Sequence, residues 1–149
     1  MKSCYTVLII SNYNVDIKLL SHLLDDEYVI YNETDNESGF TAAGEMQPDI
    51  ILLDFNLTEA NSSESDKLLF KLMHTEATKD IPIIVITEFR TSDAGMNLFT
   101  LGAADYLVKP VSAYNVSSSI RNQMRIKENE KTGINHLSIK LGKFYDRQS

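Results

Sequence analysis

Short, continuous apolar runs bounded by polar residues lie at four places in the chain, residues 5–10, 49–54, 81–87 and 106–108. Runs of this kind are typical of strands that are buried on both faces, as in the middle of a parallel sheet. Residues 28–31 alternate weakly between apolar and polar positions and predict a shorter strand, of the type found at sheet edges. The apolar pattern therefore predicts five strands.

The segments between these strands favour helices. Apolar residues recur from Val15 onwards at the spacing of one helical face, and Asn14 is a suitable cap for that helix. Further helices are expected over residues 40–46, 67–73 and 92–101, the last ended by Gly102, and from about Ser112, with Val116, Ile120 and Met124 as its inner stripe. The polar stretches 32–38 and 55–66 are expected to be loops.

Strands and helices that alternate in this way predict a doubly wound α/β fold with a five-stranded parallel sheet. Right-handed crossovers leave few topologies, and the flavodoxin-like (βα)5 order 2-1-3-4-5 is the one expected here. A chain of 149 residues corresponds to one domain with a short remainder. We therefore predict a domain over residues 1–127 and an extension over residues 128–149, which can be a helix, a linker stub or a dimer contact.

Composition and charge argue against several classes of protein. The chain has 14 basic and 21 acidic side chains and a net charge of −7, which argues against binding to nucleic acid or to an anionic membrane surface. Cys4 is the single cysteine, so no intrachain disulfide can form, and the amino terminus lacks the long apolar run of a signal peptide or membrane span. These features predict a cytoplasmic protein without direct contact to nucleic acid or membrane.

Four polar side chains are expected to meet at one edge of the predicted sheet. Asp54 ends the central strand, Asn12 follows the first, Thr87 ends the fourth and Lys109 follows the fifth. The carboxyl ends of parallel strands lie at the same edge, where open α/β sheets bind ligands. A carboxylate beside a hydroxyl and an ammonium can accept a phosphoryl group, because the last two balance charge on the phosphoryl oxygens. The alternative for Asp54 is a strand-end carboxylate that only caps a loop.

Three segments resemble the receiver domain of two-component response regulators. They are residues 48–54 (PDIILLD), 81–87 (IPIIVIT) and 101–110 (LGAADYLVKP), and the resemblance extends over about residues 5–127. It implies that residues 1–127 form a receiver domain of a two-component phosphorelay. The implied partner is a sensor histidine kinase or a phosphotransfer protein.

The resemblance also assigns roles to five positions. It implies that Asp54 is the phospho-acceptor, that Thr87 is the hydroxyl that moves toward the phosphoryl group, and that Lys109 binds that group. Tyr106 is implied to be the aromatic switch that follows Thr87 inward, although it can also be a half-buried aromatic on an edge strand. The Lys109–Pro110 peptide bond is implied to be cis. Such a module switches the face of its fourth helix, fifth strand and fifth helix, and is not an enzyme beyond phosphoryl transfer to Asp54.

The implied metal site departs from the family pattern. Receivers carry two adjacent acids after the first strand that hold magnesium, and Ser11 and Asn12 stand in their place. The remaining ligands that the resemblance implies are Asn12, Asp54 and the backbone carbonyl of Asn56. Because a hard divalent cation favours several charged oxygen ligands, we expect Mg²⁺ binding to be weak or absent. Ser11 and Asn12 can equally be turn residues that cap the first helix.

Two further departures concern access to Asp54. Glu88 stands where the family usually has a small residue, and its carboxylate would crowd and repel an incoming phosphoryl group. The loop over residues 55–66 lacks the family's usual proline and glycine, having Thr58 and Ser62. We therefore expect phosphorylation of Asp54 to be inefficient, or regulation to occur without it.

Other functions remain as alternatives. The same fold can act as a docking or dimerisation scaffold that is not phosphorylated, and the chain can form a homodimer or precede a C-terminal output domain. A flavodoxin-like hydrolase or nucleotide-binding protein is disfavoured. No glycine-rich phosphate loop follows the first strand, and neither a nucleophile elbow nor a metal-ligand cluster occurs in the sequence.

Overall fold

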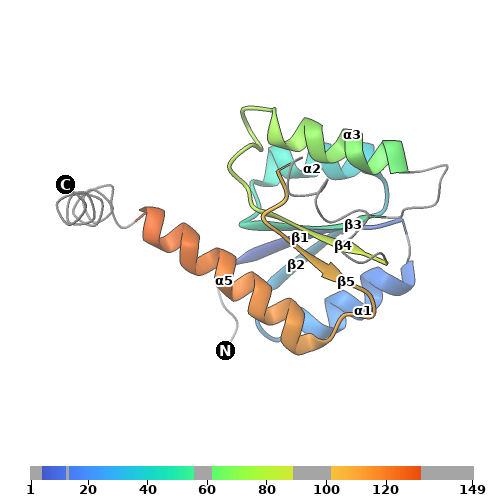
Figure 1. The fold of residues 1–149 in the computed structure, drawn as a ribbon, viewed down its shortest axis with the longest axis vertical. Helices are drawn as coiled ribbons and strands as arrows, with labels where there is room; N and C mark the ends of the chain where they lie inside the picture. Colours follow the sequence, from blue (N-terminus) through green and yellow to red (C-terminus); the bar gives the residue numbers. More distant parts are fainter. Residues whose placement is uncertain (1–4, 13, 56–61, 89–101, 132–149) are drawn as a thin grey trace, which may run out of the picture.

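The computed structural model describes residues 5–12, 14–55, 62–88 and 102–131. Five parallel strands form one sheet in the order β2-β1-β3-β4-β5. The strands are β1 (Thr6–Ile10), β2 (Val29–Glu33), β3 (Ile50–Phe55), β4 (Ile83–Thr87) and β5 (Asp105–Val108). The predicted α/β fold and strand order are confirmed, and so is the position of β2 at an edge (Figure 1).

Helices cover both faces of the sheet. They are α1 (Asn14–Leu24), α2 (Asn36–Met46), α3 (Ser62–Met73) and α5 (Ala113–Lys131). Helices α2 and α3 pack on one face and α1 and α5 on the other (Figure 1). The helix predicted over residues 92–101 lies outside the described residues. Across the described ranges, the structure contains no helix with the length and apolar character needed to span a membrane.

The central strand β3 is apolar on both faces. Ile51 and Leu53 belong to the core with α2 and α3, whereas Ile50 and Leu52 belong to the core with α1 and α5. All four side chains are at most 1% exposed. A strand buried in this way carries polar side chains only at its ends. The apolar run therefore places the side chain of Asp54 at the carboxyl edge of the sheet.

Helices α2 and α3 begin earlier than the apolar spacing predicts, at Asn36 and Ser62. Asp35 caps α2, because its side chain accepts a hydrogen bond from the backbone N–H of Ser38 at 2.8 Å. The first turns of both helices consist mostly of polar residues, which an apolar pattern does not detect. The last residues of both predicted loops are therefore helical, and that part of the prediction is wrong.

Helix α5 packs along the sheet through Val116, Ile120 and Met124, which confirms the predicted inner stripe. It is also tied to β5, because Ser119 donates a hydrogen bond to Oδ2 of Asp105 at 2.6 Å. The helix is 19 residues long and continues to Lys131. The first residues of the expected extension thus continue α5 without a break.

Candidate functional site at the carboxyl edge of the sheet

Asp54 is buried at the carboxyl edge of the sheet. Its side chain is 1% exposed, and it lies near the end of β3 in register with Ile86 of β4. Burying an ionised carboxylate is costly unless opposite charge and hydrogen-bond donors surround it. The partners of its two oxygens therefore determine what this site can do.

Lys109 supplies the opposite charge. It directly follows β5, where its backbone N–H donates a hydrogen bond to the carbonyl of Thr87 at 2.7 Å, and the Lys109–Pro110 peptide bond is cis. Its Nζ lies 2.8 Å from Oδ1 of Asp54, and its side chain is 18% exposed. The structure thus joins two of the predicted site residues in a largely buried ion pair.

Ser11 supplies a second contact, which the sequence did not predict. It directly follows β1, is 1% exposed, and donates its backbone N–H to the carbonyl of Glu33 at 3.0 Å. Its Oγ donates a hydrogen bond to Oδ2 of Asp54 at 2.7 Å. The sequence shows Ser11 at a position where receivers carry an acid. From that difference we expected the loss of a ligand for Mg²⁺, and not a hydrogen-bond donor to Asp54.

The other predicted site residues differ in how far they are buried. Thr87 ends β4 and is fully buried, whereas Tyr106 of β5 is half-buried and packs against the core on the side of α2 and α3. Asn12 is exposed. Asn56 lies outside the described residues. The backbone carbonyl of Thr87 accepts the hydrogen bond from the N–H of Lys109, so the end of β4 is joined to the residue that follows β5.

A cavity of about 320 Å³ lies beside the ion pair. Its polar lining comes from Asp54, Glu88 and Lys109, and its apolar lining from Leu19, Leu20, Ile86, Pro110 and Val111. Glu88 is exposed. An anionic group that approaches Asp54 through this cavity therefore passes close to a second carboxylate.

The described residues at this edge do not fit Mg²⁺. The ion demands a near-octahedral set of oxygen ligands and gives up its water reluctantly. Asp54 offers one carboxylate, whose oxygens already face the hydroxyl of Ser11 and the ammonium of Lys109. Among the described residues, no group of three or more His, Cys, Asp or Glu side chains is placed to hold a metal ion. Within the described part of the chain, the groups that face the oxygens of Asp54 are therefore a hydroxyl and an ammonium.

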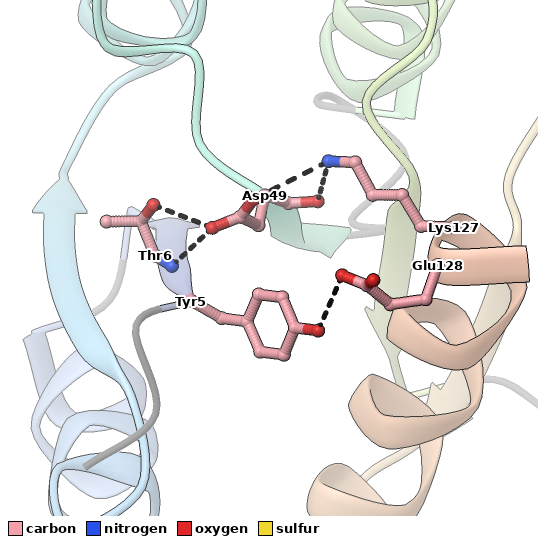
Figure 2. A network of polar contacts seen from close by, with 5 residues as sticks. All are labelled: Tyr5, Thr6, Asp49, Lys127 and Glu128. Atoms are coloured by element: carbon pink, nitrogen blue, oxygen red, sulfur yellow. Dashed lines mark hydrogen bonds and ion pairs between the residues drawn. The ribbon is translucent and has the colours of Figure 1, made fainter. Parts of the chain in front are cut away.

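A second polar network lies at the opposite, amino edge of the sheet (Figure 2). Asp49 immediately precedes β3, and its Oδ2 accepts hydrogen bonds from the N–H of Thr6 at 2.7 Å and from its Oγ1 at 3.0 Å. Lys127 donates to the backbone carbonyl of Asp49 at 3.1 Å, and its Nζ lies 3.7 Å from Oδ1. The hydroxyl of Tyr5 donates to Oε1 of Glu128 at 3.0 Å. This network ties α5 to the starts of β1 and β3.

Comparisons with known proteins agree with this architecture. A family model described as the response regulator receiver domain matches residues 7–121. The transcriptional regulatory protein YdfI of Bacillus subtilis (strain 168) is 33% identical over 110 residues, which cover 72% of this chain and 49% of YdfI. The transcriptional regulatory protein LnrK of the same organism is 27% identical over 101 residues, which cover 68% of this chain and 44% of LnrK. The match thus spans less than half the length of either relative.

Solved structures share the fold. A putative response regulator from Chloroflexus aurantiacus J-10-fl has a TM-score of 0.73 and 22% identity, covering 83% of this chain and 99% of its own. The chemotaxis protein CheY4 of Vibrio cholerae has a TM-score of 0.71 and 19% identity, covering 80% of this chain and 98% of its own. At such identities the likeness concerns the fold alone.

Proposed function

Because this chain belongs to the response regulator receiver domain family, we propose that it is a signal-transduction receiver module whose reacting group is Asp54. One observation carries the proposal: the buried carboxylate of Asp54 lies at the carboxyl edge of the sheet with Nζ of Lys109 2.8 Å away. The adjoining cavity gives a phosphodonor a route to this pair. The proposed donor is a sensor histidine kinase or a phosphotransfer protein.

The proposed step is a phosphoryl transfer to the carboxylate. An oxygen of Asp54 attacks the phosphorus of a phosphorylated imidazole, so that an O–P bond forms while the P–N bond breaks. The leaving nitrogen keeps the electron pair of the broken bond and takes up a proton from solvent. Lys109 balances the charge on the phosphoryl oxygens, and the hydroxyl of Thr87 turns toward them.

Thr87 and Tyr106 connect this step to the surface of the domain. Thr87 ends β4. Tyr106 lies on the neighbouring strand β5, where it pairs with Val85 of β4. The backbone hydrogen bond from Lys109 to Thr87 joins the ends of the two strands. A displacement of Thr87 therefore moves β5 against β4. The face that responds comprises β5, α5 and the helix predicted over residues 92–101.

A docking or dimerisation scaffold without phosphorylation is the second candidate, and two contacts of Asp54 and one neighbouring carboxylate favour it. Ser11 and Lys109 already engage both oxygens of Asp54. Glu88 adds a carboxylate to the cavity through which a donor would approach. These contacts lower the reactivity of Asp54 toward an anionic phosphodonor. In this alternative the face of β5 and α5 binds its partner, or a second copy of the chain, without any covalent change.

The relatives are longer than the matched region, so the role of the whole protein is also a proposal. YdfI and LnrK are named as transcriptional regulatory proteins, and BarA of Escherichia coli (strain K12), which is 27% identical over 113 residues, as a signal transduction histidine-protein kinase. We propose a receiver domain over residues 1–127 and a helical extension or linker over residues 128–149. Such an extension can connect the receiver to an output domain.

Covalent labelling with phosphoramidate tests the function. The parent chain, Asp54→Asn and Asp49→Asn are incubated with the reagent, and intact-protein mass spectrometry counts the phosphoryl groups added. The parent and Asp49→Asn should gain one phosphoryl group, and Asp54→Asn none. Asp49 is the matched control because it lies at the other end of β3, held by Thr6. A parent that is never labelled would contradict phosphorylation and support the scaffold, whereas labelling of Asp54→Asn would place the acceptor elsewhere.

Glu88 provides a second test of the same proposal. Glu88→Ala should raise the initial rate of labelling about three- to fivefold, because an exposed like charge contributes at most about 1 kcal/mol. The control is Glu45→Ala, which removes an exposed carboxylate from α2. Equal rates for the two variants would show that Glu88 does not repel the donor.

A further inference from the structure

Ser11 and Lys109 face the two oxygens of Asp54 from different sides of the sheet edge, one after β1 and the other after β5. We propose that this hydroxyl and this ammonium take the place of a divalent cation at Asp54, so that the protein alone holds the carboxylate. Ser11 is then a positioning residue of the site. The inference deepens the proposed function and rests on it for the reactive role of Asp54.

The direction of the Ser11 hydrogen bond carries the first step of the argument. An ionised carboxylate only accepts hydrogen bonds, so the proton between the two oxygens, which are 2.7 Å apart, belongs to Ser11. Both residues are buried, Ser11 at 1% and the side chain of Asp54 at 1% exposure. A cation that binds Oδ2 must therefore share this oxygen with the Ser11 hydrogen bond, in a site with little access to water. A charge-assisted hydrogen bond of this kind is stronger than one between neutral groups.

The local charge carries the second step. Lys109 places its positive charge 2.8 Å from Oδ1, which leaves the pair close to neutral. A dication beside Asp54 would gain attraction from one carboxylate and lose much of it to repulsion from Lys109. Mg²⁺ also has to give up water to reach this position, and it does so reluctantly.

The amino edge of the sheet carries a related arrangement around a more exposed carboxylate. Asp49 is held there by the hydroxyl and N–H of Thr6 and by Lys127 (Figure 2). The protein therefore holds a carboxylate at each end of β3 with a hydroxyl from the β1 segment and a lysine. At both ends a lysine of the chain itself supplies positive charge next to the acid.

Calorimetric titration with magnesium chloride tests the inference directly. The proteins compared are the parent, Asn12→Asp, the double variant Ser11→Asp/Asn12→Asp, and Ala77→Asp, which adds one exposed charge in the turn after α3 as a control. We expect no saturable binding at millimolar Mg²⁺ for the parent and Ala77→Asp.

The double variant should bind Mg²⁺ at least about tenfold more tightly than the parent, because the added carboxylates supply hard oxygen ligands next to Asp54. Circular dichroism verifies folding, and if the double variant unfolds, Asn12→Asp, altered at an exposed position, decides the result.

Two results would overturn the inference. One is saturable Mg²⁺ binding by the parent, with an affinity within about threefold of the double variant. The other is failure of every folded acidic variant to bind better than the parent, since the donors would then not be what excludes the ion.

Labelling with phosphoramidate separates this inference from the proposed function. In the parent, the rate should change less than twofold between Mg²⁺ and EDTA, and loss of labelling in EDTA would overturn the inference. A parent that is labelled under neither condition contradicts the phosphoryl-accepting function. The calorimetric comparison still decides whether Ser11 and Lys109 replace the ion.

Discussion

The two ends of β3 carry the same types of residue in different surroundings. Each end has an aspartate, a hydroxyl from the segment of β1 beside it, and a lysine from the β5–α5 part of the chain. At the carboxyl edge the aspartate side chain is 1% exposed and the lysine Nζ lies 2.8 Å from it. At the amino edge the aspartate side chain is 26% exposed and the corresponding distance is 3.7 Å.

The difference shows how burial separates the proposed reactive group, Asp54, from a structural one, Asp49. Asp49 accepts a backbone N–H and a hydroxyl on the same oxygen, and Lys127 donates to its backbone carbonyl, so this end joins main chains. Asp54 is bound by side chains, from Ser11 and Lys109, and borders a cavity. The same types of side chain therefore join β1, β3 and α5 at the amino edge, and hold a carboxylate beside a cavity at the carboxyl edge.

Removal of the lysines should have the largest effect on the free energy of unfolding, and the effect should differ most between the two ends of β3. Lys109→Met should lower the free energy of unfolding by about 3 kcal/mol, because it leaves a buried carboxylate without its cation. Lys127→Met should lower it by at most about 1 kcal/mol, since that pair is partly exposed. Methionine keeps the apolar stem in both cases, and urea denaturation measures the losses. Equal losses would contradict the distinction between the two ends.

Removal of Asp49 should have the next largest effect. Asp49→Ala should cost about 2 kcal/mol, because the N–H and hydroxyl of Thr6 lose their acceptor. Asp49→Asn should cost about half of that, because its amide oxygen can still accept from Thr6. Urea denaturation measures both, and hydrogen exchange at the amide of Thr6 should be faster in the alanine variant. A larger loss in the asparagine variant would show that the charge, and not the acceptor, holds this edge.

Removal of the hydroxyls of Ser11 and Thr6 should change the free energy of unfolding by smaller amounts. Ser11→Ala should lower the free energy of unfolding by about 1.5 kcal/mol, because Oδ2 of Asp54 loses a buried, charge-assisted hydrogen bond. Thr6→Val should cost about 0.5 kcal/mol, since the N–H of Thr6 still binds Asp49. Thermal denaturation followed by circular dichroism is sufficient for this pair. A valine variant that is less stable than the alanine variant would reverse the comparison.

The smallest effect is expected from the charge of Asp35, an exposed aspartate that serves as a reference for Asp49 and Asp54. The N–H and O–H of Ser38 lower the pKa of Asp35 below its ordinary value of 3.8. A pKa depressed by folding stabilises the protein above the unfolded pKa and loses this contribution as pH falls through the folded pKa. The difference in melting temperature between parent and Asp35→Ala should therefore be present at neutral pH and shrink below about pH 4. Asp35→Asn still caps the helix and should remove most of the pH dependence, and a difference that grows in acid would contradict this sign.

The sheet and the ion pair could be predicted because they follow from local pattern and topology. In a chain of alternating strands and helices, an apolar run such as Ile50 to Leu53 predicts a strand that is buried on both faces. Once the strand order is fixed, Asp54 and Lys109 must lie at the same edge. The starts of α2 and α3 escaped prediction because caps and buried serines, and not apolar spacing, determine them.

The contacts of Ser11 and Asp49 could not be predicted from the sequence. Whether Ser11 donates to Asp54 depends on the direction in which the backbone leaves β1, and a hydroxyl in a polar turn has many competing partners. Lys127 lies 78 residues from Asp49, and their contact depends on the length and direction of α5. Both contacts result from tertiary placement that no short segment encodes.

Helix α5 acts mechanically as a rod that is clamped at more than one point. Its 19 residues correspond to a length of about 28 Å. Ser119 fixes it to the start of β5, and Lys127 and Glu128 fix it to the amino edge of the sheet. A helix attached at two places and packed on the sheet through Val116, Ile120 and Met124 resists swinging away from it. If Asp54 accepts a phosphoryl group as proposed, a displacement of β5 would therefore be transmitted along α5 toward Lys131.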